Sequence, residues 1–345
     1  MNTYRSEKQT RLLRYFCALL MIVAMVGIAE ILEEKEIIFP EMAALTIGMW
    51  IVDKRVWRVS RGQMVALMTI GALVGVCIVR YSPFPLLVNI PIAFIFAACC
   101  LLFSRTTLIP QISACMLPVL LKTESWVYPA AVFCMSLIIV GGQYLMERRK
   151  IRYPIPHTPV HKNFRKEVLQ WLFLLCTLLL IAFIPIYTSN LYCILPPLIV
   201  TYVEFANSKA GFRNRPVQVF LFLVIAGTLG TLFQIVGHHY WKLPESIVAF
   251  SIILCLFTLY EQAGKFFAPA GAIALIPLIV PQDNLIWLPL QIAIGAAIFI
   301  TTAMLLFLKC YKWPKAHLIV CLIPAIVRRS SAHSRKRKTN LSGIK

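Results

Sequence analysis

Two short apolar segments combine prolines with the few groups that could bind a ligand inside a membrane. The first contains Pro110 and Gln111, and the second contains the run Pro269-Ala270-Gly271. Proline interrupts a helix, and a helix that restarts at a proline presents free N-terminal amides and the positive end of its dipole, which favour an anion. These five residues are therefore predicted to bind substrate.

Arg105 and Lys265 stand just before these two segments. Positive charge at the two helix starts would strengthen the attraction for an anion, so both cations join the predicted substrate-binding set. In the alternative interpretation, the prolines only kink the helices and the two cations face cytoplasmic water.

Acidic residues near the apolar segments are the candidates for proton coupling. Glu41, Glu204, Glu245 and Glu261 all sit toward segment ends, where a charge costs less than the ~2.5–3.5 kcal/mol of the bilayer centre. A structural role is therefore the simpler expectation for most of them. Glu41, directly after Pro40, is the predicted proton-coupling residue.

No pattern of catalytic residues accompanies these groups. The sequence has no nucleotide-binding loop, no Ser/His/Asp arrangement and no paired catalytic carboxylates, so we expect no enzyme activity and no cofactor. His238 and His239 are adjacent, point differently and are assigned to a solvated loop rather than to a metal site.

Composition places these residues in a membrane. Of the 345 residues, 59% are hydrophobic and 14% are charged, against about 45–50% apolar and about 25% charged residues in soluble domains. The apolar residues form blocks long enough to cross a ~30 Å hydrocarbon layer. The net charge of +20 is then explained by basic cytoplasmic loops and contacts with membrane lipids, and no nucleic acid is expected as a partner.

Hydropathy predicts an all-α, polytopic protein with about twelve membrane-spanning helices. The predicted segments are 13–31, 37–52, 63–80, 83–103, 106–121, 126–146, 168–187, 190–206, 217–236, 243–261, 266–281 and 286–308. With both termini in the cytoplasm, only Lys35, Arg80, Lys122 and Lys242 of the 34 Lys and Arg residues lie outside. This asymmetry predicts a multi-pass protein of the bacterial cytoplasmic (inner) membrane.

The segments divide into two halves that resemble each other. Similar landmarks occur in the same order, and Pro110 and Pro118 have the same spacing as Pro269 and Pro277. Since six spans are an even number, the copies should be parallel repeats. The expected divisions are a first repeat (1–146), a basic linker (147–166), a second repeat (167–308) and a basic tail (309–345). Within the tail, an apolar stretch at 317–327 and a basic run at 334–338 suit anionic lipid, and a disordered tail without such a role is the alternative.

The second half resembles the HPP family of integral membrane proteins. The likeness rests on the run from Phe267 to Pro277 and on Asn214-Arg215-Pro216, followed by the helix with Gly227 and Gly230. It covers about 190–285, and through the duplication it extends more weakly to 37–122. The resemblance implies transport of a small, nitrite-like anion between the repeats. Phe267-Ala268 replaces the His-Pro pair of the family, so any role of that histidine is absent.

Two other functions compete with this one. Arg215 and the Gly227-Thr-Leu-Gly230 span are similar to the FUSC-type exporters, which would imply efflux of organic or aromatic acids, although the linker has no room for the cytoplasmic domain usual in that family. A non-transporting membrane scaffold is the third reading. Assembly into a homo-oligomer, the substrate and the coupling ion stay open.

Overall fold

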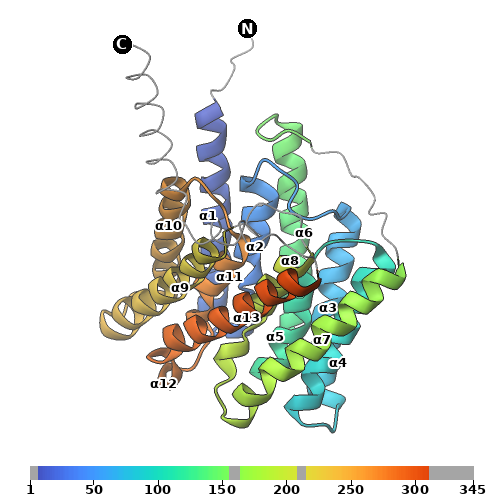
Figure 1. Ribbon diagram of the computed structural model, residues 1–345. Helices are drawn as coiled ribbons and strands as arrows, with labels where there is room; N and C mark the ends of the chain where they lie inside the picture. Colours follow the sequence, from blue (N-terminus) through green and yellow to red (C-terminus); the bar gives the residue numbers. More distant parts are fainter. Residues whose placement is uncertain (1–6, 155–163, 208–214, 311–345) are drawn as a thin grey trace, which may run out of the picture.

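The structure is a computed structural model that describes residues 7–154, 164–207 and 215–310. Every regular element within these ranges is a helix, as predicted (Figure 1). The central part of the predicted linker and nearly all of the predicted tail, with its stretches at 317–327 and 334–338, lie outside the described residues.

Eight of the described helices are long and apolar enough to cross a membrane. Eight such helices are consistent with a multi-pass membrane protein. The eight are α1 (Glu7–Ile31), α3 (Arg61–Tyr81), α4 (Leu86–Ser104), α6 (Val127–Arg148), α7 (Phe164–Tyr187), α9 (Pro216–Phe233, continued by the π-helix η4, Gln234–Tyr240), α10 (Glu245–Ala263) and α13 (Leu288–Cys310).

The other four predicted spans also form helices, but shorter ones. They are α2 (Glu41–Thr46) between η1 (Lys35–Ile37) and η2 (Ile47–Ile51), α5 (Pro110–Leu121), α8 (Pro196–Asn207) after η3 (Leu191–Ile194), and α11 (Ala268–Leu275) with η5 (Ile276–Leu278); the small α12 (Gln282–Leu285) follows. We call α2, α5, α8 and α11 the short helices. A helix of 12 residues is about 18 Å long, which is less than the hydrocarbon thickness.

Prolines determine where the short helices begin. Pro110 and Pro196 are the first residues of α5 and α8, Pro269 is the second of α11, and Pro40 immediately precedes α2. Proline suits the first turn because its missing N–H would have no helical partner there. The chain before each proline is irregular or forms a tight turn, so the apolar segments seen in the sequence are longer than their helices.

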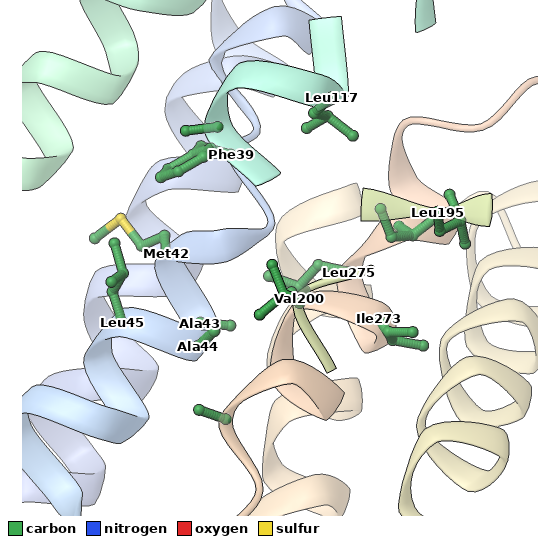
Figure 2. Close-up of a cluster of buried hydrophobic side chains, with 14 of the residues drawn as sticks. Phe39, Met42, Ala43, Ala44, Leu45, Leu117, Leu195, Val200, Ile273 and Leu275 are labelled. Carbon is green, nitrogen blue, oxygen red and sulfur yellow. The ribbon is translucent and has the colours of Figure 1, made fainter. Parts of the chain in front are cut away.

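The short helices lie inside the protein. Every described side chain of α2 and α8, every residue of α11, and every residue of α5 except Leu121 are buried. Figure 2 shows the resulting cluster, with Met42 on α2, Leu117 on α5, Val200 on α8 and Ile273 on α11. Irregular backbone at membrane depth is tolerated where protein covers it, as the long helices do here.

The ends of the segments gather at two opposite ends of the bundle. At one, which we call the Arg14 end, Arg14 pairs with Asp53 at 2.5 Å, the backbone N–H of Thr107 donates to the Arg58 carbonyl, and Arg61 pairs with Glu147. At the other, which we call the Lys35 end, Lys35 pairs with Glu245 at 3.3 Å and the Glu30 carboxylate accepts a hydrogen bond from the Ser246 hydroxyl at 3.0 Å.

Contacts between the helices follow a reciprocal pattern. Helix α3 packs against α5, and α9 packs against α11. Across the two halves of the chain, α2 packs against α11 while α5 packs against α8, and α1 packs against α10 while α4 packs against α7. Figure 1 shows α1 and α10 side by side although they are far apart in the sequence. Both halves share one continuous apolar core.

Candidate functional site

The four short helices meet in the middle of the protein, and three predicted substrate-binding residues lie at one of their contacts. Pro269, Ala270 and Gly271 on α11 are buried against α2. A Cβ atom on Gly271 would come within 2.6 Å of the Ile47 side chain, so this glycine allows the two helices to touch. The contact is apolar, and at this place the three residues pack the two helices closely together.

The backbone N–H groups at the starts of α5 and α11, which were predicted to bind an anion, already have hydrogen-bond partners. The Gln111 N–H donates to the Leu108 carbonyl at 3.1 Å, and the Ile112 N–H donates to the Ile109 carbonyl at 2.9 Å. In the other half, the Ala270 N–H donates to the Phe267 carbonyl at 3.2 Å. Tight turns before Pro110 and Pro269 therefore supply carbonyl partners that the sequence did not reveal, and an anion would have to displace them.

Arg105 and Lys265 do not join the buried prolines. Both side chains are exposed at the Arg14 end, which agrees with the alternative interpretation of these cations. Arg105 ends α4 in a left-handed conformation, with φ 51°, and Gly264 ends α10 in the same way, with φ 60°. The residue that ends α10 in this conformation is thus Gly264, one residue before the Lys265 that the sequence comparison paired with Arg105.

Glu41 does occupy the middle of the protein. It is the first residue of α2, and only 2% of its surface is exposed. One carboxylate oxygen accepts a hydrogen bond from the Ser113 hydroxyl of α5, and the other has no partner among the described residues. Two short helices are therefore joined by a buried carboxylate. Ser113 was missed in the sequence because a single serine in an apolar segment carries no distinctive pattern.

Gln111 adds an unsatisfied amide to the same helix. The residue is fully buried on α5, its amide oxygen has no hydrogen-bond partner among the described residues, and its amide group lies beside the Cys100 thiol of α4. It faces α3, where a Cβ on Gly71 would lie 3.5 Å from the amide nitrogen. Leaving a buried polar group unpaired costs about 1–3 kcal/mol, so Gln111 has the capacity to bind a polar ligand.

A cleft of about 360 Å³ opens at the Lys35 end, between the two halves. Its lining combines ammonium, hydroxyl and amide groups with one carboxylate and an apolar floor. The polar lining residues are Lys35, Glu36, Lys122, Thr123, Tyr128, Ser189, Tyr192 and Asn284, and the others are Ile38, Leu117, Leu120, Leu121, Leu191, Ile279 and Pro281. Donor groups outnumber the single carboxylate, which suits a small anion.

The cleft lies directly over the Glu41–Ser113 contact. Ile38 and Leu117 line it. Ser113 precedes Leu117 by four residues on α5, which places it about one helical turn below the lining, and Glu41 contacts this serine. Sequence reasoning could not find this cleft because its walls come from loops and helix ends that are distant in the chain.

A second buried carboxylate lies on α8. Glu204 is 4% exposed and accepts a hydrogen bond from the indole Nε1–H of Trp57 at 3.0 Å. Trp57 belongs to the connection between η2 and α3, in the other half of the chain. The sequence assigned Glu204 a structural role, and a partner 147 positions away could not be recognised from local pattern.

The two adjacent histidines lie half-buried in the π-helix η4 at the Lys35 end, so the prediction of a solvated loop was wrong. His238 Nε2 lies 3.6 Å from the Glu245 carboxylate, and the rings of His238 and His239 are 5.1 Å apart. Within the described ranges, no group of three or more His, Cys, Asp or Glu residues is arranged to hold a metal ion.

Comparisons of the chain with models of protein families, with curated proteins and with solved structures find no match.

Proposed function

We propose that the chain is a secondary transporter or channel for a small anion, with its pathway between two parallel repeats. The observation that carries this proposal is the cleft between the halves, which lies over the buried Glu41–Ser113 pair. A buried carboxylate with an unpartnered oxygen is costly at membrane depth, and such groups commonly mark ion or proton pathways.

The order of elements supports the repeat. Each half has a long helix, a short one, two long ones, a short one and a long one, and the reciprocal contacts of α2 with α11 and α5 with α8 suit a two-fold axis along the membrane normal. Interrupted helices at matching places in two halves are typical of transport sites.

The ends of the short segments support twelve crossings. The segment from Lys35 to Asp53 begins beside Glu245 and ends beside Arg14, at opposite ends of the bundle. Likewise, the segment that includes α5 begins with Thr107 beside Arg58 and ends at the cleft with Lys122. Because basic residues are concentrated at the Arg14 end, we propose that this end faces the cytoplasm of a bacterium and that the cleft opens outside.

The chemistry of the cleft favours a small monovalent anion. Lys35 and Lys122 supply positive charge, while Thr123, Ser189 and Asn284 offer hydrogen bonds that fit nitrite or formate. The HPP-like run from Phe267 to Pro277, which includes α11, agrees with this substrate class. The proposed pathway thus uses the cleft, Gln111 and Glu41 rather than Arg105 and Lys265.

Efflux of an aromatic acid is the second candidate. Tyr128, Tyr192 and Leu120 give the cleft aromatic and apolar surface, and its volume is large enough for a single aromatic ring. This reading shares the pathway of the first and differs only in the substrate.

Reconstitution into liposomes tests the proposal. Purified protein would be compared with protein-free vesicles at pH 7.5, with nitrite, formate and benzoate as probes. Uptake of nitrite or formate above the protein-free rate supports the small-anion transporter, and selective benzoate flux supports the exporter. No flux of any of the three anions would contradict transport and leave the scaffold reading in its place.

A further inference from the structure

The four short helices contain only two charged residues, and both are carboxylates. Glu41 is the first residue of α2, and Glu204 is the ninth of α8, whereas α5 and α11 have none. Both α2 and α8 begin toward the Lys35 end; Glu41 is the first residue of α2, whereas Glu204 lies about 12 Å beyond the start of α8, toward the Arg14 end. The two carboxylates therefore occupy different depths.

Trp57 closes the Arg14 end over Glu204. The indole ring is 2% exposed and lies so close to Gly48 of η2 that a Cβ there would come within 2.5 Å of the ring. Its Nε1–H crosses to Glu204 on α8. One side chain thus covers the end of the α2–η2 segment from the first half and binds a helix of the second half.

The surroundings of Glu204 make this hydrogen bond sensitive to charge. Helix α8 packs against α5, α11 and α13, and no described side chain of these three helices is charged. It also contacts α7, where Gln170 donates to the Ala206 carbonyl at 3.1 Å, and the charged residues in the first turn of α7 are the exposed Arg165 and Lys166 and the half-buried Glu167. The connection that bears Trp57 contains Asp53, Lys54, Arg55 and Arg58; Asp53 pairs with Arg14, Arg55 interacts with Glu147, and Lys54 and Arg58 are exposed. Among the described residues, burial and Trp57 dominate the environment of this carboxylate.

We propose that Glu204 is a second proton-binding group, which holds the Arg14 end of the pathway closed through Trp57 while it is ionised and releases it when protonated. A hydrogen bond to a carboxylate is roughly twice as strong as one between neutral groups, so protonation weakens the hold on Trp57. Among the described charged groups that could compete for the proton, only Glu41 lies on another short helix.

This inference rests on the proposed function and supplies its coupling ion. Glu41 takes a proton from the side of the cleft, where its second oxygen has no described partner. Glu41 then gives this proton up to Glu204 as the anion passes, the 52–60 connection loosens, and Glu204 releases the proton to the water at the Arg14 end, which leaves both carboxylates ionised again. A monovalent anion that moves with one proton transfers no net charge, which gives buried carboxylates a use beside a pathway for anions.

Amide hydrogen exchange of the purified full-length protein tests directly whether the Trp57–Glu204 hydrogen bond keeps the 52–60 connection closed. Exchange in residues 52–60 would be measured between pH 8 and pH 5 and corrected for the intrinsic effect of pH. We expect about tenfold faster exchange at pH 5 in the unaltered protein. In Glu204→Gln and Trp57→Phe, we expect fast exchange at both pH values, because the charged acceptor or the donor is missing.

Glu261→Gln is the matched control, since Glu261 is a half-exposed carboxylate that pairs with Arg11 at the same end. It should respond to pH as the unaltered protein does. The inference would be overturned if protection of residues 52–60 in the unaltered protein did not change with pH. It would also be overturned if Glu204→Gln showed the same pH response as the unaltered protein. If Glu204→Gln does not fold, the same pH response in Trp57→Phe would overturn it. Because no flux is measured, this result is independent of whether the anion is transported.

Discussion

Gly75 of α3 lies against the carbonyl oxygen of Cys115 of α5, so closely that a Cβ on the glycine would approach that oxygen to 2.3 Å. In the second half, a Cβ on Gly230 of α9 would approach the Ala274 carbonyl oxygen of α11 to the same 2.3 Å. Small residues let helix backbones approach closely in membranes, where packing holds helices together. The same device therefore holds a short helix in place in each half.

The two glycines should tolerate no side chain. Gly75→Ala and Gly230→Ala force a methyl group into a backbone carbonyl, and overpacking of this kind costs typically 1–3 kcal/mol. Thermal unfolding in detergent should show a clearly lower Tm for both variants. Gly141→Ala is the control, because a Cβ there meets nothing within 4 Å and alanine favours the helix. Equal Tm values for all three variants would argue against the close packing.

Glu41 should be required for uptake rather than for folding. Glu41→Gln keeps the shape of the side chain and its contact with Ser113 but removes the exchangeable proton. We expect anion uptake driven by a proton gradient to fall by tenfold or more, with an unchanged Tm. Glu33→Gln alters an exposed carboxylate at the Lys35 end and should leave uptake intact. Full uptake in Glu41→Gln would remove this residue from the pathway.

The orientation of the chain can be tested with reporter fusions. Fusions after Lys122 and Asn284, which both line the cleft, should report the periplasm, and a fusion after Arg149 should report the cytoplasm. The physical reason is the concentration of basic residues at the Arg14 end. A periplasmic signal at Arg149 would contradict both the orientation and the parallel arrangement of the halves.

Local patterns predicted the helical segments well. All twelve predicted segments contain helices, and Pro40, Pro110, Pro196 and Pro269 mark the starts of the short ones. Hydropathy measures the length of an apolar segment and not the length of the helix within it. It could therefore not show that, in four segments, the helix would be too short to cross a membrane. That distinction depends on irregular backbone being covered by other helices.

The site was harder to predict because its contacts are distant in the chain. Glu41 was identified from its place after a proline, but its partner Ser113 lies 72 positions away. Arg105 and Lys265 were chosen for their charge next to a helix start, and both are exposed because the turns that follow them bury the backbone and leave the cations in water. The cleft and the Trp57–Glu204 contact arise only when the two halves meet.

The central claim is that substrate passes through the cleft between the halves, and blocking the cleft tests it most directly. Leu121 lines the cleft and is only partly buried, so Leu121→Trp fills space without entering the core. Leu137→Trp places the same ring on the outer surface of α6, where Leu137 is 46% exposed. Nitrite uptake into proteoliposomes should be lost with Leu121→Trp and normal with Leu137→Trp. Equal uptake by the two variants would contradict a pathway through the cleft.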